Sequence, residues 1–213
     1  MLHLGYHRGV KAVLFDMGGV LIDLDVERCV EAFIKNAGFT TIRQYLDTSH
    51  QRGFIGLFEQ GLISENEFYA ECLSRSKKGT TRETISKCIG SLLVGIAPAK
   101  VDFLRKLSKY CSLYMVSNNN PVAMYYIEKH FSDSGIPIDE IFKGVFCSYK
   151  LKVMKPAREY FAKVLDKVPY SPSDMVFVDD SKLNVEAAAE FNIDSRHYRQ
   201  GDDLEVFLQP SYN

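Results

Sequence analysis

The sequence predicts an α/β fold in which a Rossmann-like parallel sheet, flanked by helices, carries an inserted all-helical cap. Two features of the chain predict it. Short apolar runs recur, and each is followed by a polar or glycine-rich turn and then by helical periodicity, which is typical of repeated βα units. Residues 16–111 separate the first apolar run from the second, far more chain than one crossover helix needs. We therefore expect a second structural unit between the first two strands.

Five segments have the length and composition of strands. Most are short apolar runs, as expected for parallel strands that helices cover on both faces. The predicted strands are residues 10–15, 112–117, 144–147, 174–179 and 194–198. A helix is predicted to follow the insertion, from Pro98 to about Lys109.

The inserted segment has the pattern of several amphipathic helices. They are predicted over residues 26–36, 41–59, 64–76 and 81–93. Ser64 and Glu67 have the spacing of a capping box, in which each side chain accepts a hydrogen bond from the other residue's backbone N–H. Aromatic side chains at helical spacing, which are Phe54, Phe58, Phe68 and Tyr69, favour a cap core. We assign residues 24–95 to a helical cap domain and residues 1–23 and 96–213 to the α/β core domain.

The composition excludes several classes of protein. The chain has 213 residues, 46% of them hydrophobic and 25% charged, which suffices for a buried core. A formal net charge of -1 gives no general attraction to nucleic acid or anionic lipid. The five cysteines form no C-x-x-C pair, which argues against a disulfide framework and a thiolate zinc site. No apolar segment fits a signal peptide or a membrane span. We expect a cytoplasmic protein that contacts neither nucleic acid nor a membrane.

Polar motifs follow the first two predicted strands, at the edge where parallel sheets bind ligands. Asp16 is followed closely by Gly18 and Gly19. A carboxylate there can attack phosphorus, while glycines let backbone N–H groups approach phosphate oxygens. Ser117 and Asn118 follow the second strand, where a hydroxyl and free N–H groups at a helix start form a phosphate cradle. Taken singly, both motifs also suit ordinary turns and helix caps.

Two further motifs supply charge. Lys155 stands directly before Pro156, where a fixed cation could neutralise an attacking carboxylate and a phosphoryl group, although a lone lysine also suits a solvated surface. Asp179 and Asp180 close a buried apolar run, and Asn184 lies one turn into the next predicted helix. Adjacent buried acids repel each other unless a cation is present, and Mg²⁺ prefers one or two carboxylates together with phosphate oxygens.

Together, these four motifs resemble motifs I to IV of the haloacid dehalogenase-like hydrolase superfamily. The residues that carry the resemblance are Asp16-x-Gly18-Gly19-Val20, Ser117-Asn118, Lys155-Pro156 and Asp179-Asp180, in this order and each at the end of a predicted strand. The match spans the whole core, and four motifs in order form a specific signal. Within the superfamily the chain is similar to the branch with a helical cap between motifs I and II, which includes sugar-phosphate and glucose-1-phosphate phosphatases.

The resemblance implies a Mg²⁺-dependent phosphatase that hydrolyses a small phosphorylated metabolite, possibly a sugar phosphate. Asp16 would be the nucleophile and would form an aspartyl-phosphate. One oxygen of Asp16, the backbone carbonyl of Gly18 and the carboxylate of Asp180 would hold the metal. Asp179 and Asn184 would orient the groups around the metal or the motif III lysine.

The same resemblance implies how the transferred group is held. Ser117 and the backbone N–H groups near Gly18, Gly19 and Asn118 would bind the phosphoryl oxygens. Lys155 would balance their charge. The protein would then act by positioning and by charge stabilisation.

The chain departs from the family pattern at Gly18. Many phosphatases of the superfamily have a second acid there, which protonates the leaving oxygen and then activates water. General acid–base assistance is typically worth about 10²–10⁴-fold, so its loss favours an ester whose alcohol leaves easily, such as an anomeric sugar phosphate. Candidate replacements are Asp23, Asp25 and His50, although Asp25 also suits a helix N-cap and a single helical histidine is commonly structural.

Two alternatives remain open at this point. A metal-independent haloacid dehalogenase would also use an aspartate nucleophile without the second acid, but the pair Asp179-Asp180 is hard to explain without a cation. A catalytically idle relative would bind a phosphorylated ligand or a protein partner and turn nothing over.

Overall fold

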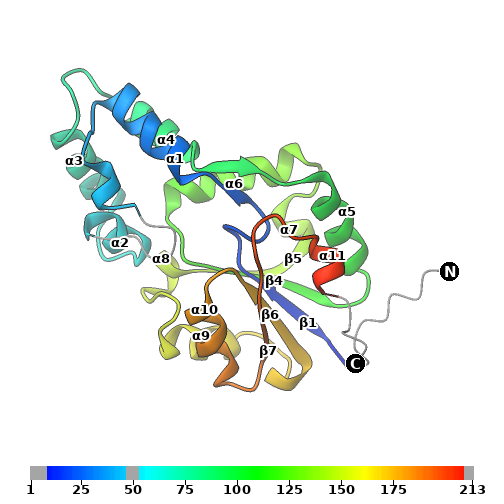
Figure 1. The fold of residues 1–213 in the computed structure, drawn as a ribbon. Coiled ribbons are helices and arrows are strands. Elements are labelled where there is room, and N and C mark those ends of the chain that lie inside the picture. Colours follow the sequence, from blue (N-terminus) through cyan, green and yellow to red (C-terminus); the bar gives the residue numbers. More distant parts are fainter. Residues whose placement is uncertain (1–8, 47–52, 209–213) are drawn as a thin grey trace.

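The computed structural model describes residues 9–46 and 53–208, and its centre is a five-stranded parallel sheet (Figure 1). The strands lie in the order β5-β4-β1-β6-β7. In sequence order they are β1 (Ala12–Phe15), β4 (Ser112–Ser117), β5 (Phe142–Cys147), β6 (Met175–Asp179) and β7 (Asp194–His197). Each boundary lies within two residues of the predicted one, so the predicted sheet is confirmed.

Helices cover both faces of this sheet, which explains why its central strands are apolar throughout. Alternate residues of β1 enter different cores: Val13 and Phe15 belong to one, Ala12 and Leu14 to the other. Toward the first core lie α5 (Pro98–Leu107), α6 (Pro121–Asp133), α7 (Ile138–Ile141) and α11 (Leu204–Phe207). Toward the second lie α8 (Ser148–Leu151), α9 (Arg158–Leu165) and α10 (Lys182–Ala189).

The sheet order places a ligand site beside β1. The chain adds strands on one side of β1 first and on its other side later, so β1 lies at the point where the strand order reverses. In register, Phe15 pairs with Met115 of β4 and with Val178 of β6. The residues that follow these strands therefore meet at one edge, where open parallel sheets bind ligands.

Four helices form a separate projection beyond that edge of the sheet (Figure 1). They are α1 (Val26–Ala32), α2 (Gly53–Glu59), α3 (Glu65–Ser74) and α4 (Arg82–Gly90). Helix α1 continues as a π-helix, Phe33–Ala37, and the capping box of Ser64 and Glu67 is present at the start of α3. The side chains of Phe54, Phe58, Phe68 and Tyr69 are buried in the cap core, as predicted.

The predicted continuous helix over residues 41–59 is wrong. A 3₁₀-helix covers Ile42–Gln44, the next two residues are not helical, and α2 is described over Gly53–Glu59. Gly53, at the described start of α2, has a φ of 57°, a left-handed conformation that does not allow one uninterrupted right-handed helix to run through this position.

A short antiparallel ribbon joins the projection to the sheet, and the sequence analysis does not predict it. Its strands are β2 (Asp23–Leu24) and β3 (Leu93–Gly95), with Asp23 opposite Gly95. The side chain of Gln200 extends the ribbon: its oxygen accepts the N–H of Leu24 at 2.9 Å, and its amide donates to the Leu24 carbonyl at 3.1 Å. The ribbon is too short to show the alternation that marks a strand in sequence.

In the described part of the chain, no helix has the length and apolar character needed to cross a membrane. All five cysteines are free thiols, as the sequence predicts.

Candidate active site

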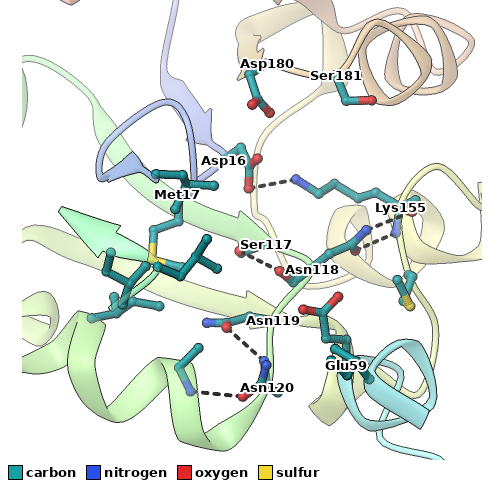
Figure 2. A pocket seen from close by; sticks show the side chains of 18 of the residues that line it. Asp16, Met17, Glu59, Ser117, Asn118, Asn119, Asn120, Lys155, Asp180 and Ser181 are labelled. Atoms are coloured by element: carbon teal, nitrogen blue, oxygen red, sulfur yellow. Dashed lines mark hydrogen bonds and ion pairs between the residues drawn. The ribbon is translucent and has the colours of Figure 1, made fainter. Parts of the chain in front are cut away.

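A pocket opens between the sheet edge and the helical projection, and the ends of β1, β4 and β6 supply its polar wall (Figure 2). It encloses about 140 Å³, which suits only a compact part of a ligand. Its polar lining contains Asp16, Gly18, Ser117, Asn118, Lys155, Asp180 and Asn184. The opposite wall comes from the inserted segment and is mostly apolar, with Ile55, Ile89, Leu92 and Leu93.

Lys155 lies at the centre of the polar wall. Its Nζ is 2.9 Å from Oδ1 of Asp16 and 2.6 Å from Oδ2 of Asp179, and it donates a third hydrogen bond to the carbonyl of Val116 at 2.9 Å. Its side chain is only 1% exposed. Burial alone would lower the pKa of Lys155, but the two carboxylates outweigh burial and raise it. The ammonium group is thus a fixed buried charge.

Asp179 is saturated by contacts within the protein. One oxygen of Asp179 accepts a hydrogen bond from Lys155. The other accepts the N–H of Ser181 at 2.8 Å and the side-chain amide of Asn184 at 2.9 Å. Asp180 has no such partners for its carboxylate among the described residues, and it faces the pocket next to Asp16 (Figure 2). Asp180 is therefore the motif IV acid that is free to bind a ligand.

The residues of this cluster fit a divalent cation. Asp16, Asp179 and Asp180 each place one oxygen within 4.8 Å of the others, while a single lysine neutralises them. Burial, with Asp179 and Asp180 nearby, raises the pKa of Asp16 to about 7 despite Lys155. Burial and Asp179 raise the pKa of Asp180 to about 6. In the described chain, Oδ1 of Asn184 is also buried without a hydrogen-bond partner. A hydrated cation would neutralise the excess negative charge of the carboxylates and supply a hydrogen-bond partner for Oδ1 of Asn184.

Ser117 and Asn118 lie where β4 ends, but they play different structural parts. Ser117 is buried in the pocket wall, and its hydroxyl lies near Asp16 and donates to the carbonyl of Asn118 at 3.4 Å (Figure 2). The Asn118 side chain instead makes two hydrogen bonds with the backbone of Lys155. It accepts the Lys155 N–H at 2.8 Å and donates to the Lys155 carbonyl at 2.9 Å. Motif II thereby fixes the position of motif III.

The two glycines after Asp16 are required for close approach. A Cβ on Gly19, which has a φ of 74°, would lie 2.2 Å from Oδ2 of Asp180. The N–H of Gly19 donates to the carbonyl of Ile22 at 2.8 Å, so this donor is used within the turn. A Cβ on Gly18 would lie 2.9 Å from Cδ1 of Leu24. The space of the missing second acid is thus filled by an apolar side chain.

The predicted substitutes for that acid lie elsewhere. Asp23 pairs with Lys100 at 2.8 Å, and Asp25 caps α1 by accepting the N–H of Arg28 at 2.9 Å. Neither lines the pocket. His50 lies outside the described residues.

The structure adds one acid that the sequence analysis missed. Glu59, the last residue of α2, lines the pocket together with Asp16 and Gly18. Burial raises the pKa of its carboxyl group to about 8, and a hydrogen bond from Asn120 only partly opposes this. A signal existed in the sequence, since an acid at a helix C-terminus is disfavoured by the helix dipole.

Comparisons with known proteins agree with this geometry. The model of the haloacid dehalogenase-like hydrolase family matches residues 10–192. D-ribitol-5-phosphate phosphatase of Bacteroides thetaiotaomicron is 30% identical over 195 residues, which cover 91% of this chain and 94% of that enzyme. A sesquiterpene phosphatase of Aspergillus oryzae is 28% identical over 182 residues, 84% of each chain.

A solved structure is similar over nearly the whole molecule. It is a variant of a HAD family enzyme from Bacteroides thetaiotaomicron in complex with magnesium and inorganic phosphate, with a TM-score of 0.89 and 32% identity. The likeness covers 95% of this chain and 100% of that one. With the four motifs gathered around one pocket and a family match over residues 10–192, this chain belongs to the haloacid dehalogenase-like hydrolases.

Proposed function

We propose that this protein is a Mg²⁺-dependent phosphatase that hydrolyses a small phosphate monoester through an aspartyl-phosphate on Asp16. One observation carries the proposal: Asp16, Ser117, Lys155 and Asp180 converge on a single pocket from four separate segments of the chain. The similar proteins of Bacteroides and Aspergillus are phosphatases by name, which supports the same reaction class here.

In the first half-reaction, a carboxylate oxygen of Asp16 attacks phosphorus and the ester oxygen leaves. Lys155 holds Asp16 in place at 2.9 Å, and its charge favours the ionised carboxylate that attacks. Asp179, Val116 and Asn118 in turn hold Lys155, so its charge is in position before the substrate arrives. Such preorganised charge is the main source of catalysis in phosphoryl transfer.

Ser117 and the backbone N–H of Asn118 bind the oxygens of the transferred phosphoryl group, because the N–H groups of Asn119 and Asn120 are used within the protein. Asp180, one oxygen of Asp16 and the carbonyl of Gly18 would hold Mg²⁺. When bound, the cation neutralises negative charge on the phosphoryl oxygens and on the two carboxylates. Asp179 and Asn184 serve as positioning residues for Lys155 and for the motif IV turn.

The substrate class follows from the pocket and from the named relative. The pocket is small and has a polar floor with an apolar wall, so it encloses the phosphoryl group and the adjacent part of a compact alcohol. A polyol or sugar phosphate fits this description, and D-ribitol 5-phosphate, the substrate in the name of the Bacteroides enzyme, is the first compound to assay.

We also propose that residues 24–95 form a cap domain on a core of residues 1–23 and 96–213. The ribbon of β2 and β3 supports this division, because it pairs Asp23 with Gly95 and so brings both boundaries to one point. The chain enters and leaves the cap there.

The proposal is tested by phosphate release from a panel of polyol, sugar and nucleotide phosphates, with Mg²⁺ and with EDTA. We expect turnover that chelation abolishes, and no turnover by Asp16→Asn. Turnover that persists in EDTA would contradict the magnesium mechanism, and full activity of Asp16→Asn would contradict the nucleophile.

The same assay separates the alternatives. Halide release from 2-haloacids without metal would indicate a dehalogenase. Binding of Mg²⁺ and inorganic phosphate without turnover of any ester would indicate a catalytically idle relative.

A further inference from the structure

Hydrolysis of an alkyl phosphate needs a proton for the leaving oxygen and a base for the attacking water. The position that supplies both in many relatives is Gly18, and Leu24 fills the adjacent space, with Cδ1 2.9 Å from where a Cβ would lie. In residues 9–46 and 53–208, Leu24 and not a carboxyl group therefore occupies the place beside Gly18. Any acid must come from another part of the pocket.

Three carboxyl groups line the pocket in the described part of the chain: Asp16, Asp180 and Glu59. The first two face the metal and the phosphoryl group. Glu59 comes from the cap helix α2, and Figure 2 shows its carboxyl group near Asn118 and Asn119, apart from the metal cluster. In-line displacement places the leaving oxygen opposite the attacking oxygen of Asp16, which directs the leaving alcohol away from the sheet and toward the cap.

The end of α2 is fixed to the core, which gives Glu59 a defined position. The hydroxyl of Ser148 in α8 donates to the Glu59 carbonyl at 2.5 Å and accepts the N–H of Asn119 at 2.9 Å. Lys152 binds the carbonyl of Gly61 just beyond α2. The cap residue and the motif II turn thus share one buried hydroxyl.

The surroundings of the half-buried Glu59 favour the protonated form of its carboxyl group. Burial raises its pKa to about 8, and no ion pair reaches it from the described residues. Asn120 is oriented by its role as the N-cap of α6, because its Oδ1 accepts the N–H of Ala123 at 2.9 Å. The amide NH₂ of Asn120 is therefore the end that faces Glu59, where it donates a hydrogen bond.

We propose that Glu59 is the acid–base residue of this enzyme and replaces the carboxylate that relatives carry at the position of Gly18. The inference rests on the proposed phosphatase function. In the first half-reaction, the bond from Asp16 to phosphorus forms, the ester bond breaks, and the proton of Glu59 goes to the leaving oxygen. In the second, water attacks phosphorus and gives its proton to Glu59, while Asp16 leaves as a carboxylate and inorganic phosphate is released.

The test compares two esters that differ in their need for an acid. The alcohol of ribitol 5-phosphate leaves poorly, whereas the nitrophenolate of p-nitrophenyl phosphate leaves without a proton. In Glu59→Gln, we expect turnover of ribitol 5-phosphate to fall about 10²–10⁴-fold. With p-nitrophenyl phosphate, stopped-flow absorbance should still show a burst close to one nitrophenolate per chain, followed by slow turnover because water lacks its base.

Three controls make the result specific. Glu65→Gln changes an exposed acid of the same cap and should match the wild type with both esters. Glu59→Asp keeps an acid and should recover part of the ribitol 5-phosphate activity. Inorganic phosphate with Mg²⁺ should raise the Tm of Glu59→Gln as much as that of the wild type, which shows that the pocket is intact.

Two outcomes would overturn the inference. An equal loss of the first step with both esters would assign Glu59 to substrate binding, and unchanged turnover of both would give it no part in the reaction. Each is distinct from failure of the proposed function, in which the wild type itself releases phosphate from neither ester.

Discussion

The Nζ of Lys155 lies 2.6 Å from Oδ2 of Asp179, and both side chains are almost completely buried. This ion pair joins motif III to motif IV beneath the pocket. The other oxygen of Asp179 receives hydrogen bonds from Ser181 and Asn184, so the carboxylate that binds the lysine is itself held in position. The pair orients the lysine that touches Asp16.

Removing the charge of Asp179 should be costly for stability. In Asp179→Asn, the amide that replaces Oδ2 would point a donor at a buried ammonium group. Breaking a buried pair by changing one partner costs about 3–5 kcal/mol. We expect a decrease of this order in the free energy of unfolding, measured by urea denaturation with EDTA present.

A surface pair provides the matched control. Asp174 binds Lys11 at 2.8 Å, but the lysine side chain is 58% exposed. Asp174→Asn should therefore cost at most about 1 kcal/mol. Equal losses in the two variants would show that Lys155 does not depend on Asp179.

Removal of magnesium should destabilise the protein in a pH-dependent way. The pKa values of Asp180 and Asp16 are raised to about 6 and about 7, above the ordinary value of 3.8. A raised carboxyl pKa stabilises the folded state at low pH, and this contribution is lost as pH rises through the folded-state pKa. The metal-free protein should thus lose stability between about pH 4, near the unfolded-state pKa, and about pH 7, the higher of the two folded-state values.

Magnesium should compensate for this loss, since it binds the ionised carboxylates. We expect the increase in Tm caused by Mg²⁺ over EDTA to be small at pH 5 and to grow toward pH 8, as measured by differential scanning fluorimetry. An increase that does not change with pH would indicate that the cation binds elsewhere.

Much of the fold and the polar wall could be predicted from the sequence because the signals are local. Strands β1, β4 and β6 are apolar runs with functional residues at their ends, as in the segment that ends at Phe15 and continues with Asp16. Parallel strands then bring these residues to one edge by geometry alone. For the same reason, the contacts of Ser117 and Lys155 with the pocket follow from the order of the motifs.

The features that could not be predicted from the sequence depend on contacts between segments far apart in the chain. The ribbon of β2 and β3 has too few residues to show a pattern, and Gly53 breaks a helical periodicity through its left-handed conformation. The position of Glu59 at the pocket depends on contacts with the core, such as the hydrogen bond from Ser148 to the end of α2. No spacing in the sequence connects these two residues.

Gly19 should be required for the metal site. In Gly19→Ala, a methyl group would lie 2.2 Å from the present position of Oδ2 of Asp180 and would displace that carboxylate. We expect Mg²⁺ affinity, measured by isothermal titration calorimetry, to fall at least about tenfold, as for the loss of a group that orients a metal ligand.

Gly79 separates this effect from backbone strain. It also has a positive φ, of 87°, but a Cβ there would meet nothing within 4 Å. Gly79→Ala should lose about 1 kcal/mol of stability and no Mg²⁺ affinity. If both variants bind Mg²⁺ as the wild type does, Gly19 has no part in placing Asp180.

Gln200 should control how readily the ribbon opens. Its side chain replaces a missing strand by bonding both backbone groups of Leu24, and Leu24 in turn occupies the space beside Gly18. Gln200→Ala removes two hydrogen bonds, each worth about 1 kcal/mol, so the Leu24 amide should exchange about 5–30 times faster. Hydrogen exchange followed by mass spectrometry measures this rate. Gln44→Ala, at an exposed position of the cap, should leave it unchanged, and equal exchange in all three proteins would show that the ribbon is held without Gln200.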